Sequence, residues 1–248
     1  GSEIAVISIM HSNNELGSIQ PIAEIVKIAG DIPVHTDAVQ SFGKVEFDFA
    51  ALNVTAATIS AHKIGGPLGV AALILKRGLD LTPVLHGGGQ EREIRSGTLN
   101  APSIVAFTAA AEYAIANMAT NFKKIRELRD YFVAGLKKCV PDVSINSITD
   151  PALPGIVNAT FPGTESDALL LLLDTEGISA SAGSACSAGV PRPSHVLVAL
   201  GLSESDADAS LRISIGTTNT KAEIDQVLAI LPSVVERARN AFVVSELN

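Results

Sequence analysis

The sequence predicts an α/β protein with a larger first domain, built on a mainly parallel sheet, and a smaller α+β domain after it. Three observations support this. In the first half, short runs rich in valine and isoleucine alternate with helical patterns, which is typical of a parallel sheet. A long helical pattern follows, and beyond it strand and helix patterns resume. We therefore expect two domains, at residues 1–120 and 121–248.

The first domain is expected to contain four strands and an early helix. The strands are predicted at 4–10, 33–36, 56–60 and 70–75, and the helix at 22–29. Polar residues follow three of these segments, at 11–14, at Asp37 and at 60–63. Because ligands of such sheets bind just beyond the carboxyl ends of the strands, we expect the chemistry of this domain there.

A long helix, or two helices with a kink near 117–121, is predicted over residues 102–138 and is expected to connect the two domains. Shorter elements follow it. The expected strands are 143–148, 156–161, 178–182 and 211–215, and the expected helices are 165–175, 193–200 and 221–239. This mixture is typical of a small α+β domain.

The composition argues against several classes of partner. The longest apolar runs, 69–75 and 168–173, are far shorter than the ~18 residues of a membrane span, so no membrane partner is expected. The formal net charge is −8, only 4% of residues are aromatic, and no block of lysine or arginine occurs. A nucleic-acid partner is therefore not expected either. The first residues show no secretory pattern.

The two cysteines, Cys139 and Cys186, form neither a zinc-ligand spacing nor a disulfide framework, so we expect no metal and a reducing, cytoplasmic location. Cys139, at the end of the long helical pattern, is interpreted as structural. Cys186 stands at the centre of SAGSACSAG at 181–189. Such small residues restrain the backbone least, which favours a mobile, reactive thiol. Composition alone leaves a buried, inert thiol as the alternative.

Lys63 and Asp37 are the first candidates for chemistry in the larger domain. Lys63 follows a strand within SAHKIGGP, and a lysine desolvated at such a position can present the neutral amine that forms a Schiff base. Asp37 also follows a strand, where a carboxylate can face the pyridine nitrogen of pyridoxal phosphate. Taken alone, a surface lysine beside a turn and an aspartate that forms a turn remain open.

Seven stretches together resemble the cysteine desulfurases of the NifS and IscS type, which are pyridoxal-phosphate enzymes of the class-V aminotransferase family. In chain order they are HSNNELGSIQPI at 11–22, HTDAVQSFGK at 35–44, SAHKIGGPLGV at 60–70, HGGGQEREIRSGT at 86–98, SAGSACSAG at 181–189, PSHVLVALGL at 193–202 and LRISIGTTNTKAEID at 211–225. Their order and spacing run through almost the whole chain. The resemblance implies the pyridoxal-phosphate-dependent transferase fold, similar to that of aspartate aminotransferase.

The resemblance implies a cofactor site for pyridoxal 5′-phosphate. Lys63 matches the lysine that binds the cofactor covalently, Asp37 matches the partner of the pyridine nitrogen, and Gln40 matches the residue that bonds the phenolic oxygen. Ser60 and His62 match ligands of the phosphate, and His62 also matches an acid–base helper near the cofactor.

The resemblance also implies a substrate and partners. Asn14 and Arg212 match the pair that holds the carboxylate of L-cysteine, a task that suits the planar guanidinium. Cys186 matches the nucleophile that takes the sulfur as a persulfide, leaves L-alanine, and passes the sulfur to a protein acceptor such as an iron–sulfur scaffold. Thr98 matches a residue that reaches the phosphate in the neighbouring subunit, which implies a homodimer.

The chain departs from the family pattern at its beginning. Complete members carry, ahead of the stretch near Ile4, a long portion with a phosphate-binding turn and a histidine that stacks on the pyridine ring. We therefore expect a fragment with a partial large domain, which binds pyridoxal phosphate weakly or not at all. Two alternatives stay open: a non-catalytic relative that binds partners, and an enzyme similar to selenocysteine lyase.

Overall fold

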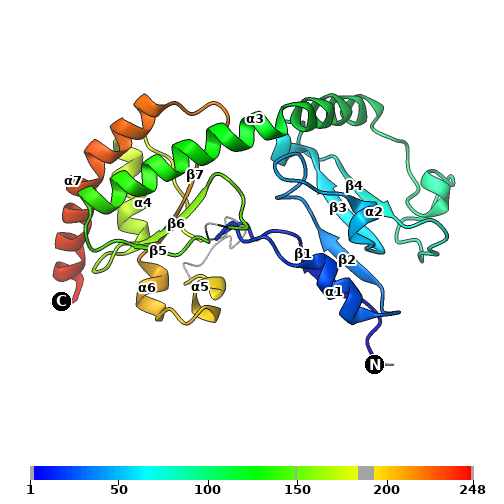
Figure 1. Cartoon of the computed structure of the whole chain (residues 1–248), viewed down its shortest axis with the longest axis horizontal. Coiled ribbons are helices and arrows are strands. Elements are labelled where there is room, and N and C mark those ends of the chain that lie inside the picture. The colour runs from blue at the N-terminus through cyan, green and yellow to red at the C-terminus, as the bar shows by residue number, and fades with distance from the viewer. Residues whose placement is uncertain (1–2, 149, 184–192, 247–248) are drawn as a thin grey trace. The chain divides into compact units, whose positions relative to one another are not determined.

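A computed structural model of the chain describes residues 3–148, 150–183 and 193–246, with side chains as far as residue 241. The chain divides into two compact units (Figure 1). Unit 1 comprises Gly1–Ser12 and Gln20–Ala119, and unit 2 comprises Asn13–Ile19 and Thr120–Asn248. The short segment Asn13–Ile19 thus belongs with the C-terminal half of the chain, whereas a division by chain order placed it in the first domain. No described helix is long and apolar enough to cross a membrane.

Unit 1 is built on a four-stranded sheet with the order β1-β2-β3-β4. Its strands are β1 (Ile7–Met10), β2 (Val34–Asp37), β3 (Ala56–Ser60) and β4 (Ala71–Leu75). The pairs β1·β2 and β2·β3 are parallel, and β4 joins β3 in the antiparallel sense. The predicted mainly parallel sheet is confirmed, with one antiparallel strand at its edge.

Two apolar clusters hold this unit together. One gathers Ile22 and Ala29 of α1 (Ile22–Ala29) with residues of β2 and β3, next to α2 (Phe49–Leu52). The other joins Ile59 to Phe107 of α3 (Ala101–Cys139). Two short 3-10 helices, η1 (Ala61–Ile64) and η2 (Glu91–Glu93), complete the unit. Helix α2 was not predicted; its beginning is fixed by Asp48, whose side chain accepts hydrogen bonds from two backbone amides.

Helix α3 runs without interruption from Ala101 to Cys139, so the alternative of two helices kinked near 117–121 is wrong. Residues 101–119 belong to unit 1 and residues 120–139 to unit 2. Because the kink region contains neither proline nor glycine, nothing in the sequence interrupts the backbone hydrogen bonds there.

Unit 2 contains a three-stranded antiparallel sheet with the order β5-β6-β7. The strands are β5 (Ser144–Ile145), β6 (Ile156–Thr160) and β7 (Ser210–Ser214). One face of this sheet is apolar and contributes Val157, Ala159 and Leu211 to the main core, and the alternate residues give the other face a polar character. The strand predicted at 178–182 is absent, because only Ser181 pairs with β7, in an isolated bridge to Arg212.

The remaining helices of unit 2 are α4 (Ser166–Thr175), α5 (His195–Ala199), α6 (Glu204–Asp208) and α7 (Lys221–Glu246). The second half of α3, α4 and α7 pack on the apolar face of the sheet, and α4 and α7 lie side by side (Figure 1). Phe132 of α3, Leu169 of α4 and Leu231 of α7 are among the buried residues of this core. Helix α6 was not predicted. It follows α5 directly, and a small cluster that includes Leu16, Leu197 and Ala207 packs the pair.

Candidate functional site

The carboxyl ends of β2 and β3 lie side by side, and both carry predicted site residues. Asp37 is the last residue of β2 and pairs with Thr58 of β3, whose last residue is Ser60. The carboxylate of Asp37 is exposed, and its Oδ1 accepts a hydrogen bond of 2.9 Å from the backbone amide of Val39. This hydrogen bond fixes the orientation of the Asp37 carboxylate at the carboxyl end of β2.

Lys63 is carried on η1, the 3-10 turn directly after β3. The turn ends at Gly65, whose φ of 84° lies in the left-handed region that glycine tolerates. Ala61 is fully buried at the base of the turn, while His62 and Lys63 are exposed. The hydroxyl of Ser60 and Nδ1 of His62 share a hydrogen bond of 2.7 Å. A short, braced turn therefore presents an amine, an imidazole and a hydroxyl at this edge.

The turn that follows β2 packs directly against η1. It is closed by backbone hydrogen bonds from Phe42 to Ala38 and from Val45 to Ser41. At its tip Gly43 has a φ of 72°, and a Cβ there would lie 2.8 Å from Cβ of Ala114 and 3.1 Å from Cγ2 of Ile64. Only glycine fits this contact, which brings the turn bearing Gln40 against the turn bearing Lys63.

Lys44, the last residue of HTDAVQSFGK, was not predicted to be a site residue. Its Nζ donates a hydrogen bond of 3.4 Å to Oε1 of Gln40. Burial, and then the nearby positive charge of Lys63, lowers the pKa of the Lys44 amine to about 8. The only feature of the sequence that pointed to this contact was the spacing of four residues between Gln40 and Lys44.

His11 ties the end of β1 to the same turn. The ring is buried; Nδ1 lies 2.7 Å from Oγ of Ser41, and the ring packs edge-on against Phe47. Ser41 in turn shares a hydrogen bond of 2.6 Å with the hydroxyl of Ser12. Burial lowers the pKa of His11 below its ordinary value. The neutral imidazole thus links the end of β1 to the turn after β2.

Arg212 is the predicted site residue on β7 of unit 2. Its backbone exchanges two hydrogen bonds, of 2.7 and 3.1 Å, with Ser181, and its Nη1 donates to the carbonyl of Asn14 over 3.2 Å. The Nε atom is buried and finds no hydrogen-bond acceptor among the described residues. Asn158 pairs with Arg212 across the sheet, and its Nδ2 atom is likewise buried without a hydrogen-bond partner among the described residues. Asn158, like Lys44, was not predicted from the sequence to be a site residue.

The segment that carries Asn14 forms a tight turn. Oδ1 of Asn13 accepts hydrogen bonds from the backbone amides of Glu15 and Leu16, at 2.8 and 2.9 Å. Glu15 is only 1% exposed, and its Oε2 accepts a hydrogen bond of 2.5 Å from the hydroxyl of Ser194. Ser194 is also the N-cap of α5. This turn therefore anchors the start of α5 and holds Asn14 beside the guanidinium of Arg212.

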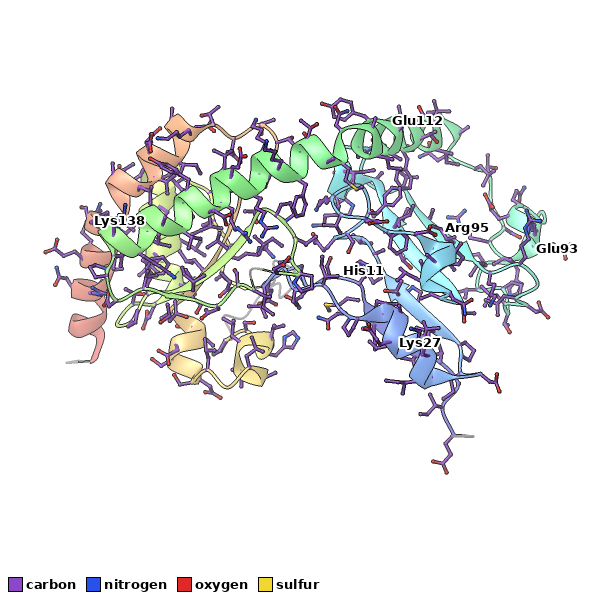
Figure 2. All side chains as sticks on the ribbon, viewed as in Figure 1. His11, Lys27, Glu93, Arg95, Glu112 and Lys138 are labelled. Atoms are coloured by element: carbon purple, nitrogen blue, oxygen red, sulfur yellow. The ribbon has the colours of Figure 1, made fainter. Side chains whose placement is uncertain are left out.

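Three predicted residues remain. Thr98 is exposed on the segment between η2 and α3. Figure 2 shows Glu93 and Arg95 of that region well away from His11, which lies at the β1 end of the same unit. Cys186 lies outside the described residues. Cys139 is partly buried, and burial raises the pKa of its thiol, as fits a structural cysteine.

The predicted residues thus form two sets. Asp37, Gln40, Ser60, His62 and Lys63 gather at one sheet edge in unit 1, and Asn14 lies against Arg212 in unit 2. The description "Aminotransferase class-V" matches residues 1–227 of the chain. The chain belongs to the class-V aminotransferase family.

Similar proteins agree with this membership. The chain is 46% identical over 242 residues to an IscS-like cysteine desulfurase of Mycobacterium tuberculosis, an alignment that covers 96% of the chain and 62% of the relative. The structure of a NifS-like protein from Rickettsia africae has a TM-score of 0.85 and 38% identity over 93% of the chain and 62% of that protein. The expected fold class, a partial large domain with a mainly parallel sheet plus a smaller α+β domain, is confirmed.

A third similar structure holds a small molecule. SspA in complex with cysteine has a TM-score of 0.67 and 37% identity, over 87% of the chain and 60% of that protein. In all three comparisons the chain spans about 60% of the length of the protein it matches.

Proposed function

We propose that this chain carries active-site residues of a pyridoxal-phosphate-dependent cysteine desulfurase, which converts L-cysteine to L-alanine and moves the sulfur to Cys186. One observation carries the proposal. In a class-V aminotransferase chain, the carboxylate of Asp37 and the turn bearing Lys63 stand at adjacent ends of parallel strands. Several relatives are themselves named cysteine desulfurase, and one neighbour is a complex with cysteine.

The donors at the edge of the unit 1 sheet fit pyridoxal phosphate. This cofactor needs an amine for its aldehyde, a carboxylate for its ring nitrogen and donors for its phosphate. Lys63, Asp37 and the bonded pair Ser60 and His62 offer these groups, and the charged members are exposed at the edge. When bound, the cofactor supplies an electron sink for the carbanion that forms at the α-carbon of the substrate.

Each unit 1 residue has a distinct task in this proposal. Asp37 keeps the ring nitrogen protonated, and Gln40 donates to the phenolic oxygen. Ser60 and His62 hold the phosphate. Lys63, carried on the braced turn after β3, would bind the cofactor covalently through its amine, and the amine released by substrate would move the proton of the α-carbon.

Arg212 and Asn14 hold the substrate carboxylate in this proposal. The buried Nε of Arg212, which lacks an acceptor among the described residues, is the donor that an incoming carboxylate oxygen satisfies. The carbonyl of Asn14 holds Nη1 and thereby sets the plane of the guanidinium. A planar fork fixed in this way binds a carboxylate at two points and orients the α-carbon.

Cys186 acts on the sulfur of the substrate. Its thiolate attacks that sulfur, and the bond from the sulfur to the β-carbon breaks. The electron pair of that bond stays with the carbon skeleton, which takes up a proton to become L-alanine. Cys186 is left as a persulfide, so no external oxidant is needed. The persulfide then passes its sulfur to a protein acceptor such as an iron–sulfur scaffold.

We also propose a cytoplasmic homodimer. A free thiol that cycles through a persulfide requires a reducing compartment. Thr98 reaches the phosphate site of the neighbouring subunit in this arrangement. Exposed apolar side chains of unit 1, such as Leu68 at 82% and Val84 at 88%, are available to a partner subunit.

The first test is an absorbance titration of the chain with pyridoxal phosphate, beside a Lys63→Ala variant. We expect a visible absorbance band that saturates with low affinity in the wild type and is missing from the variant, because the band requires the covalent link to Lys63. Identical curves for the two proteins contradict the proposed cofactor site.

The second test measures L-alanine formed from L-cysteine in the presence of a reductant. The two cysteines offer a matched pair, since Cys186→Ala should abolish turnover and Cys139→Ala should leave it unchanged. Equal activity in both variants contradicts the role of Cys186. Turnover of selenocysteine that survives Cys186→Ala instead supports the lyase alternative.

A further inference from the structure

Lys44 has no task in the proposed reaction, yet it contacts Gln40, one of the residues proposed to bind the cofactor. It lies on the turn after β2, one residue beyond Gly43, the residue that packs against Ile64 of η1. Its Nζ bonds Oε1 of Gln40, and the charge of Lys63 is close enough to affect its titration. Desolvation and the repulsion of a nearby second lysine both oppose the charged form of a lysine, so such a pair is uncommon in proteins.

The chemistry of the contact fixes the orientation of the Gln40 amide. A glutamine side chain has an oxygen that accepts and a nitrogen that donates, and the two ends can exchange places by a flip. The ammonium of Lys44 has three donors and no acceptor, so it can bond only the oxygen. With Oε1 held at 3.4 Å by Lys44, the Nε2 group is directed away from the lysine.

The packing keeps this arrangement in place. Because a Cβ at position 43 would come within 2.8 Å of Ala114 and 3.1 Å of Ile64, the turn has no room to shift toward η1 or α3. The backbone amide of Lys44 also bonds the carbonyl of Ser41 at 2.9 Å, which holds the base of its side chain. The donor and the acceptor of the contact therefore stand on one rigid turn.

We propose that Lys44 is a positioning residue of the cofactor site, which holds Oε1 of Gln40 so that Nε2 is presented as a donor to the phenolic oxygen of pyridoxal phosphate. This inference rests on the proposed function, through the task given to Gln40. Without Lys44 the Gln40 amide is free to flip, and its Oε1 would then face the phenolic oxygen of the cofactor. Two acceptor oxygens in contact repel each other.

The first experiment uses the chain without cofactor. The sequence has four glutamines, so selective 15N labelling gives few side-chain amide signals, and Gln40→Ala assigns the one of interest. We expect Lys44→Met to shift or broaden the Gln40 amide pair, and Lys44→Arg, which also only donates, to preserve it. Lys76→Met is the matched control, because Lys76 donates to an amide oxygen of Asn53 on an exposed surface. An unchanged Gln40 signal in Lys44→Met overturns the proposal.

The second experiment is a double-mutant cycle on pyridoxal phosphate binding. Lys44→Met and Gln40→Ala should each weaken binding by about tenfold, and the double variant should bind no worse than either single one, because both remove the same contact. Fully additive losses overturn the proposal. If Lys63→Ala binds like the wild type, the proposed function fails instead, and the amide signals still decide whether Lys44 positions Gln40.

Discussion

The guanidinium of Arg212 has one nitrogen, Nε, that is buried and meets no acceptor among the residues the structure describes. A buried donor without a partner costs about 1–3 kcal/mol, so a native structure retains one where a ligand or water satisfies it. This is the observation that separates Arg212 from the ion-paired arginines of the same unit, such as Arg237 with Glu176.

We predict that Arg212→Lys lowers kcat/KM for L-cysteine by roughly 10- to 100-fold, mainly through a higher KM. Lysine keeps the charge but loses the planar fork and the Nε donor. Steady-state rates over a range of L-cysteine concentrations measure the effect. Arg237→Lys, which alters an exposed ion pair in the same unit, serves as the control and should behave like the wild type. A normal KM in Arg212→Lys rules out the carboxylate role.

Lys44 is predicted to titrate far below an ordinary lysine. Burial and the charge of Lys63 lower its pKa to about 8, whereas hydrogen bonds to Tyr131 and Asp225 raise the pKa of Lys221 above its ordinary value. The neutral amine is the form that reacts, so the Lys44 amine becomes reactive as pH rises through about 8, and Lys221 stays protonated there. Competitive acylation at several pH values, read by mass spectrometry, measures both. Parallel curves for the two lysines contradict the prediction.

At the scale of elements, the junction between the turn after β2 and η1 depends on one glycine. We predict that Gly43→Ala destabilises the chain by about 1–3 kcal/mol more than Gly65→Ala does. Both glycines have positive φ, of 72° and 84°, so both variants bear backbone strain of similar size. Only at position 43 does a Cβ clash with Ala114 and Ile64, because nothing lies within 4 Å of a Cβ at position 65.

Urea unfolding of the two glycine variants and the wild type provides the measurement. Gly43→Ala should also weaken the Lys63-dependent binding of pyridoxal phosphate, since it moves the two turns apart. Equal midpoints for the two variants would show that the turns do not pack as described.

The strong elements of the fold could be predicted from the sequence. Strands β1 to β4 and helix α1 were found because a buried strand needs a continuous run of branched apolar residues, and a surface helix needs a 3.6-residue period. The short helices α2 and α6 were missed, since four or five residues form no period. The strand expected at 178–182 is a single bridge at Ser181, because an apolar run does not reveal whether a neighbouring strand is in register.

The candidate site, too, could be predicted only in part from the sequence. Asp37 and Lys63 could be singled out because they lie just beyond the ends of predicted strands, and their tasks, like those of the other site residues, remain predictions. The setting of Lys44 could not be foreseen, since Ile64 and Ala114, which pack against the neighbouring Gly43, are distant in sequence. Nor could the bond between Glu15 and Ser194, which joins two motifs 179 residues apart.

At the scale of the whole molecule, each unit has a hydrophobic core of its own. Phe132 is 0% exposed in the core of unit 2, and Ile22 is 1% exposed in a core of unit 1. We predict that Phe132→Ala costs about 3–5 kcal/mol and Ile22→Ala about 2–5 kcal/mol, each in its own unit.

Amide hydrogen exchange distinguishes the two effects. Phe132→Ala should lower protection in β6 and β7 while β2 and β3 keep theirs, and Ile22→Ala should do the reverse. Loss of protection everywhere in both variants would show that the two units unfold together.

Unit 2 is discontinuous in the chain, because Asn13–Ile19 belongs to it while residues 20–119 build unit 1. A ribosome therefore makes this segment long before it makes β7, whose Arg212 bonds the carbonyl of Asn14. Unit 1 can close early, through contacts that are nearby in sequence, whereas unit 2 must bring together ends separated by most of the chain, at an entropic cost that grows with that separation. The arginine of the proposed substrate site thus meets the carbonyl of Asn14 only after β7 has been made, so a nascent chain that ends before β7 has no such contact.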